Sequence, residues 1–170
     1  MSMAELNNEN VLKALTDAFG DAILHSEMQF GMLNVEIPAD RNLDIIGWLK
    51  SNESLKMEFL TDLCAVHYPE QKGRELAVVY HLHSWTKNYR MRIKCFVSAQ
   101  KPEIASTTGL YNAANWMERE TFDFYGVQFS GHPDLRRILN MDEMDYHPLL
   151  KQYALEDETR DDKDDSFFGR

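Results

Sequence analysis

Two alternating segments in the middle of the chain constrain its fold more than any other feature of the sequence. Between 75 and 85 apolar residues occupy every second position, and the same spacing recurs between 89 and 98. Such alternation predicts strands with one buried face. The link from Thr86 to Asn88 is short enough to join the two as an antiparallel pair.

Helical and strand-like patterns surround this pair. Apolar residues at helical spacing predict helices over 11–19, from Asp40 to about Asn52, and from near Ser106 to Phe124. Strands are expected over 21–28 and 32–37, and from Leu55 to Phe59. These elements predict an α+β fold in which helices pack on one face of an antiparallel sheet and an extended C-terminal segment follows. We divide the chain into a single α+β domain over 1–125, an extended partner-binding segment over 126–155, and an acidic tail over 156–170.

Charge and hydropathy exclude several classes of protein. The formal net charge of −10 argues against nucleic-acid binding, which needs clustered Lys and Arg. Half of that charge lies in residues 156–165, where like charges repel, so we expect a tail there. No apolar run reaches the ~20 residues of a spanning helix, and residues 1–10 lack a signal-peptide pattern. Any membrane association would therefore be indirect.

Cofactor and metal motifs are weak. Cys64 and Cys95 lie far apart without a CxxC pair, so we expect both to be reduced and buried. His81 and His83 share a strand face and could hold a metal with His67, although no carboxylate or cysteine has a matching spacing. Neither GxGxxG nor GxxxxGKS/T occurs. The sequence thus predicts no metal site and no cofactor site in this chain.

Acidic residues gather on the third predicted helix. Glu118, Glu120 and Asp123 lie close together, and Glu120 and Asp123 could form an acid–base pair. Arg119 is adjacent, and two further arginines follow soon after. A salt-bridged structural cluster is the simpler hypothesis.

A polar corner follows. Pro133 can open a turn, and the residue before a proline is held extended, so His132 would be presented on a rigid corner, with Arg136 and Arg137 after it. Arginines on a fixed turn suit bidentate pairing with carboxylates better than catalysis, since no nucleophile accompanies His132. Interface or internal ion pairing is the preferred interpretation, with anion binding as an alternative. We expect loss of the Arg136 side chain to weaken assembly by breaking a buried charge pair.

Two motifs in the C-terminal third resemble a known family. The runs ANWMERETFD at 114–123 and GVQFSGHPDLRRIL at 126–139 resemble, at the family's spacing, the C subunit of bacterial respiratory complex I and its mitochondrial and chloroplast counterparts. The similarity spans roughly residues 10 to 150. It carries over structural and interface roles, not catalytic ones, to a signature set: Glu118, Arg119, Glu120, Asp123, Gly131, His132, Pro133, Asp134, Arg136 and Arg137.

The resemblance implies a cofactor-free structural subunit in the hydrophilic arm of the proton-pumping NADH:quinone oxidoreductase. Its partners would be the subunits that form the quinone pocket and hold the terminal iron–sulfur cluster. FMN and iron–sulfur clusters would lie in neighbouring subunits. The chain would be peripheral, on the cytoplasmic side of a bacterial inner membrane, and inactive alone.

Other interpretations remain open. An equivalent subunit of a membrane-bound hydrogenase, or of a dehydrogenase with another electron donor, would carry the same motifs. An independent small enzyme or metal protein could use His67, His81 and His83, or Glu120 and His132. The chain also departs from the family's GHPLRKD-like stretch at 146–152, which reads YHPLLKQ. There the acidic tail and Phe167-Phe168 are expected to supply different contacts.

Overall fold

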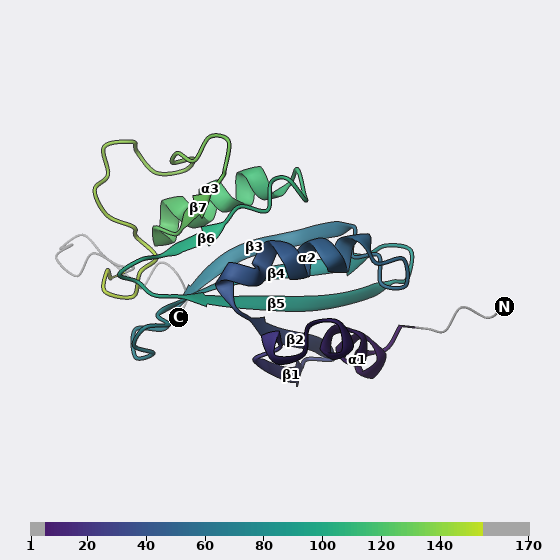
Figure 1. Cartoon of the computed structure of the whole chain (residues 1–170). Helices are drawn as coiled ribbons and strands as arrows, with labels where there is room; N and C mark the ends of the chain where they lie inside the picture. Colours follow the sequence, from purple (N-terminus) through teal and green to yellow (C-terminus); the bar gives the residue numbers. More distant parts are fainter. Residues whose placement is uncertain (1–5, 155–170) are drawn as a thin grey trace, which may run out of the picture.

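A five-stranded sheet forms the centre of the protein. The computed structural model describes residues 6–154, so the acidic tail expected over 156–170 lies outside the described residues. The strands of the sheet are β1 (His25–Gln29), β2 (Met32–Ile37), β3 (Phe59–His67), β4 (Leu76–Ser84) and β5 (Tyr89–Val97), in the spatial order β1-β2-β5-β4-β3. Two short strands, β6 (Glu103–Ala105) and β7 (Gln128–Ser130), pair separately in parallel (Figure 1).

The helices flank this sheet. They are α1 (Asn8–Phe19), α2 (Asn42–Ser51) and α3 (Ala114–Tyr125), with short 3-10 turns at Gly20–Ala22 and Ala39–Arg41. Helices α1 and α2 contribute Val11, Ile45 and Leu49 to the cluster that covers one face of the sheet. Helix α3 instead runs along the edge strand β3 (Figure 1).

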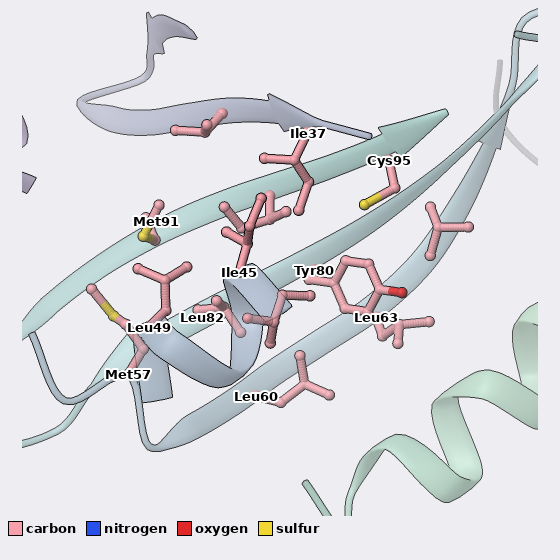
Figure 2. Close-up of a cluster of buried hydrophobic side chains, with 14 of the residues drawn as sticks. Ile37, Ile45, Leu49, Met57, Leu60, Leu63, Tyr80, Leu82, Met91 and Cys95 are labelled. Atoms are coloured by element: carbon pink, nitrogen blue, oxygen red, sulfur yellow. The ribbon is translucent and has the colours of Figure 1, made fainter. Parts of the chain in front are cut away.

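The predicted alternation supplies the core. In Figure 2, Ile45 and Leu49 of α2 point toward the sheet residues Tyr80, Leu82 and Met91. Every second residue of β4 and β5 on this face is buried: Leu76, Val78, Tyr80, Leu82, Met91, Ile93, Cys95 and Val97. Both cysteines are free thiols; Cys95 is buried as predicted, whereas Cys64 is only partly buried.

The α+β class and the β4–β5 hairpin are confirmed, and the sheet proves to be mixed rather than wholly antiparallel. Strands β2 and β5 run parallel, with Val35 opposite Ile93. Helix α2 carries the chain across the sheet from β2 to β3 at the far edge, and β4 and β5 then return between them. The β3–β4 and β4–β5 pairs are both antiparallel, so the chain reverses twice after β3, and β5 runs in the same direction as β3 and parallel to β2.

Three predicted boundaries are wrong. The third helix begins at Ala114 rather than near Ser106. The strand expected from Leu55 begins at Phe59, because Lys56 adopts a left-handed conformation (φ 49°) that ends any extended run. The strand expected from Asp21 begins at His25, after a 3-10 turn. Within residues 6–154, no helix is both long enough and apolar enough to cross a bilayer.

Candidate functional site: the C-terminal return over helix α3

A single buried carboxylate fixes the chain that follows α3, which we call the C-terminal return (residues 126–154). Asp123 has no exposed surface. Its Oδ2 accepts hydrogen bonds from the backbone N–H groups of Ile138, Leu139 and Asn140, at 3.1, 2.8 and 2.9 Å. Its Oδ1 accepts from Arg137 Nη1 at 2.7 Å and from Asn140 Nδ2 at 3.0 Å. One side chain of α3 therefore holds a stretch of chain some fifteen positions later.

The electrostatics keep this carboxylate charged. Burial raises the pKa of Asp123, but the backbone N–H groups of Asn140 and Leu139 and the side chain of Arg137 lower it by more. The pKa consequently lies well below its ordinary range, and Asp123 is an anion at neutral pH.

Arg137 extends the same network. Only 10% of its side chain is exposed. Besides the carboxylate, its guanidinium donates to the carbonyl oxygens of Asp123, Met144 and Tyr146, at 3.0, 2.6 and 2.9 Å. The planar fork thus joins α3 to two further points of the C-terminal return.

Arg119 supports the preceding turn in the same way. It is nearly buried, and it donates to the carbonyl oxygens of Arg136 and Arg137 at 3.2 and 3.0 Å. Its guanidinium also lies over the ring of Trp116, 5.3 Å from the centroid.

The predicted corner is closed by His132. Asp134 N donates to His132 Nδ1 at 3.0 Å, so the other ring nitrogen carries the proton and donates to Asn115 O at 3.0 Å. Arg136 pairs with Asp134 at 2.9 Å on the surface, where both side chains are more than half exposed. Within this chain the buried charge pair is therefore that of Arg137, not of Arg136. Gly131 starts the corner with φ 84°, a conformation suited to glycine, and Pro133 is exposed.

Glu118 holds the segment before α3. Its buried carboxylate accepts hydrogen bonds from Ser106 Oγ at 2.6 Å, Thr107 N at 2.7 Å and Thr107 Oγ1 at 2.8 Å. Burial raises the pKa of Glu118 above its ordinary value, although these hydrogen bonds oppose the shift. These contacts fix the irregular chain at Ser106 and Thr107, where the sequence predicted the first turn of the helix.

The proposed acid–base pair is not assembled. Glu120 is exposed to solvent, whereas Asp123 is buried and fully engaged with the C-terminal return. Glu120 and Asp123 are three residues apart and were expected to share a face of the helix. That spacing does not place them in the same environment.

The site residues predicted from the sequence did not include His147, which attaches the later part of the C-terminal return to the end of α3. Its Nδ1 lies 2.9 Å from the carbonyl oxygen of Asp123, and its ring packs against Gly126, the left-handed residue that ends α3. Leu149 N donates to Phe124 O, and Lys151 N donates to His67 Nδ1. Two signals were available. The His147-Pro148 pair matches the family's GHPLRKD-like stretch, and it is a typical turn dipeptide that follows a helix ending at glycine.

Apolar side chains point outward from this fixed backbone, and we call them the apolar rim. Leu139 and Met141 are 64% and 69% exposed. The rim also includes Trp116, Tyr146, Leu149 and Tyr153. Tyr146 and Tyr153 pack together with their ring centroids 4.8 Å apart.

The candidate metal ligands are separated. His67 pairs with the core residue Leu76 and so lies on the helix side of the sheet, while His81 and His83 lie on the opposite side. His81 Nε2 already accepts a hydrogen bond from Arg92 Nε at 2.8 Å. Across residues 6–154, no group of three or more His, Cys, Asp or Glu side chains is arranged to hold a metal ion.

Comparison with known proteins gives a consistent result. The family described as "Respiratory-chain NADH dehydrogenase, 30 Kd subunit" matches residues 35–159. The C subunit of the NADH-quinone oxidoreductase of Geobacter sulfurreducens is 40% identical over 159 residues, which cover 94% of this chain and 96% of that protein. The corresponding protein of Roseiflexus sp. (strain RS-1) is 41% identical over 150 residues, covering 88% and 86%.

Two solved structures share the fold. The trypsin-resistant fragment (1-134) of Nqo5 superimposes with a TM-score of 0.63 at 29% identity, covering 75% of this chain and 98% of the fragment. A chain of the membrane-bound sulfane sulfur reductase, an archaeal respiratory membrane complex, gives a TM-score of 0.71 at 22% identity, covering 86% and 85%. At that identity the second likeness concerns the fold alone.

Proposed function

This chain belongs to the family of the respiratory-chain NADH dehydrogenase 30 Kd subunit, and on that basis we propose that it is a non-catalytic structural subunit of the proton-pumping NADH:quinone oxidoreductase. It would sit in the hydrophilic arm and support electron transfer from NADH to quinone. FMN and iron–sulfur clusters would be carried by neighbouring subunits. The chain itself would bind neither.

One observation carries the structural role. The buried charges of the signature are already engaged by the chain's own backbone: Asp123 by three consecutive N–H groups, Arg137 by three carbonyl oxygens, and Arg119 by two. A catalytic acid or a substrate-binding arginine needs an accessible face. Groups used in this way instead define the shape of a surface segment.

That surface supports a partner-binding role for residues 126–155. Leu139 lies in a backbone stretch whose N–H groups are held by Asp123, and Met141 follows directly after it, so little conformational freedom would be lost on binding. Exposed apolar side chains that gather on one surface often mark a site of protein–protein interaction. We propose that the apolar rim contacts the subunits that form the quinone pocket and hold the terminal iron–sulfur cluster. The chain would thereby be peripheral, on the cytoplasmic side of the inner membrane.

The test is purification of the tagged full chain from its own membranes in mild detergent, with the partners identified by mass spectrometry. We expect the flavin, iron–sulfur and membrane subunits of the NADH:quinone oxidoreductase to co-purify. Recovery of the chain alone, or stoichiometric metal and redox activity in the isolated chain, would contradict the proposal.

A second candidate keeps the structural role and changes the complex. The fold likeness to a chain of the sulfane sulfur reductase supports it, since the scaffold occurs in a respiratory membrane complex with a different name and activity. The same purification discriminates between them. Co-purification with subunits of a hydrogenase or of another dehydrogenase, without the NADH-oxidising flavin subunit, would favour this candidate.

A further inference from the structure

The two edges of the five-stranded sheet differ in whether a helix covers them. Helix α3 runs along β3 at one edge, whereas β1 forms the other edge (Figure 1). Of the five residues of β1, only Ser26 is partly covered, and the other four are exposed. The strand contains neither lysine nor proline, the residues that commonly protect such edges from pairing.

The hairpin geometry identifies the backbone groups of β1 that pair with no other strand of residues 6–154. Phe30 and Gly31 have φ values of 52° and 76°, which define a two-residue turn of type I′. Such a turn is closed by a hydrogen-bonded pair, here Gln29 with Met32, and hydrogen-bonded pairs then alternate along the ladder. Ser26 and Met28 therefore direct their N–H and C=O groups away from β2, toward the open edge.

Side chains along this edge differ on its two sides. Met28 lies opposite the core residue Leu33, on the helix side, and remains 53% exposed. Leu24, which precedes the strand, is exposed to a similar extent. His25 and Glu27 lie on the opposite side of the sheet. The carboxylate of Glu27 is paired with Lys94, and 42% of the Glu27 side chain is exposed. An added strand would fit best with apolar residues beside Met28 and polar or basic residues beside Glu27.

We propose that β1 is a second docking site, where an extended segment of a neighbouring subunit, apolar on one side and basic on the other, adds as a sixth strand. This inference rests on the proposed function, because the neighbour is tethered to this chain through the C-terminal return. The return lies at the opposite edge of the sheet from β1, so the docking segment must reach across the sheet. Five residues form an interface well below the ~1,200 Å² of stable independent association. A segment tethered to an already bound subunit gains the affinity that such a short contact lacks on its own. The same argument disfavours a second copy of this chain as the occupant.

Residue-resolved hydrogen exchange tests the added strand directly. In the isolated full chain we expect the outward amides of Ser26 and Met28 to exchange rapidly and the inward amides of Glu27 and Gln29 slowly. In the purified complex, the outward amides should slow by at least about tenfold. Unchanged exchange would overturn the inference. Protection in the isolated chain that rises with its concentration would also overturn it, in favour of self-association.

A backbone variant provides the second test. Ser26→Pro removes an outward N–H, which an edge strand tolerates without loss of its ladder to β2. Ser26→Ala removes the hydroxyl and keeps the amide, and so is the matched control. We expect Ser26→Pro to lower the yield of intact complex several-fold at unchanged thermal stability, with Ser26→Ala at the parental yield. Equal yields would overturn the inference.

Should Ser26→Pro fail to fold, Met28→Pro with Met28→Ala repeats the test at the other outward amide. The two proposals fail in different ways. A chain that never co-purifies with the complex overturns both, whereas a chain that co-purifies with freely exchanging Ser26 and Met28 amides overturns only the added strand.

Discussion

The ring of His147 packs so closely on Gly126 that a Cβ at this glycine would lie 2.7 Å from the ring's Cδ2 atom. The contact brings a residue of the C-terminal return against the end of α3. Gly126 also has φ 80°, a conformation that favours glycine. Glycine is therefore required here both by the backbone conformation and by the space that the ring occupies.

Replacing Gly126 with Ala should therefore destabilise the protein for two separable reasons. Gly131→Ala is the control, because Gly131 has a similar φ of 84° but nothing within 4 Å of an added Cβ. The control should cost about 1–2 kcal/mol in unfolding free energy through backbone strain alone. Gly126→Ala should cost about 1–3 kcal/mol more, from the clash with the ring.

Urea unfolding of the two variants measures the difference. Adding His147→Ala should cost less in the Gly126→Ala background than in the parent, because there the loss of the ring also removes the clash. Equal unfolding free energies for Gly126→Ala and Gly131→Ala would show that the contact with His147 contributes nothing.

The two neighbouring arginines should behave differently. Arg137→Ala leaves the buried carboxylate of Asp123 without its cation and should lower the unfolding free energy by about 3–5 kcal/mol. Arg136→Ala removes an exposed pair and should change it by less than about 0.5 kcal/mol. The expected weakening of assembly by Arg136→Ala remains a separate prediction, measured as complex yield. Denaturation curves that rank the arginines in the opposite order would refute the assignment.

Acid should weaken the attachment of the C-terminal return to α3. Because the pKa of Asp123 is lowered in the folded state, its stabilisation is complete above the ordinary aspartate value of about 3.9 and is lost as the pH falls further. We expect the unfolding free energy to drop below about pH 4. Asp123→Asn should be less stable at neutral pH and should show a shallower acid dependence. A variant with the parental acid slope would place the titrating group elsewhere.

Glu118 should have the opposite pH dependence. Its pKa is raised by burial, so its contribution to stability is present below the ordinary glutamate value of about 4.3 and is lost as the pH rises through the raised value. Glu118→Gln keeps the shape and an acceptor for Thr107. Its stability relative to the parent should therefore increase from acid to neutral pH. Urea unfolding measures the difference, and Glu120→Gln, which removes a carboxylate at an exposed position of the same helix, is the matched control.

The apolar rim should contribute to assembly and not to folding. Leu139→Ser and Met141→Ser alter exposed side chains, so unfolding should change by less than about 0.5 kcal/mol. If these residues are central contacts, each should weaken partner binding by about 2 kcal/mol, or ~30-fold. Leu43→Ser, at another exposed leucine, is the matched control. Full recovery of the complex with both rim variants would move the interface elsewhere.

The sequence alone predicted those parts of the fold that depend on local spacing. Alternation placed β4 and β5 correctly, and the strands expected over 21–28 and 32–37 correspond to β1 and β2, apart from the start of β1 at His25. The parallel contact between β2 and β5 joins segments about fifty residues apart, and no local pattern encodes the direction in which they meet. The predicted strand at Leu55 was wrong because its alternation comes from a turn, in which Lys56 is left-handed and its neighbours are buried.

The charged site was predicted in membership but not in arrangement. The motif identified Asp123 and Arg137, yet the same reasoning treated Arg136 and Glu120 as their equals. Neighbouring positions on a turn or a helix differ in burial, and burial decides which charges determine stability. Asn140 carries no motif signal, and the match of His147 to the family's GHPLRKD-like stretch does not identify its partner. The partners of both residues are groups of α3 that become neighbours only in the folded chain.

The mixed sheet also has a consequence for synthesis of the chain on the ribosome. Strand β5 separates β2 from β4, so the β1–β2 hairpin finds its place only after Tyr89–Val97 has been translated. A lone hairpin is marginal in water, and until then the edge of β2 that will meet β5 is unpaired. The nascent chain is thus most open to wrong pairing during this interval, and chaperone dependence should be greatest there.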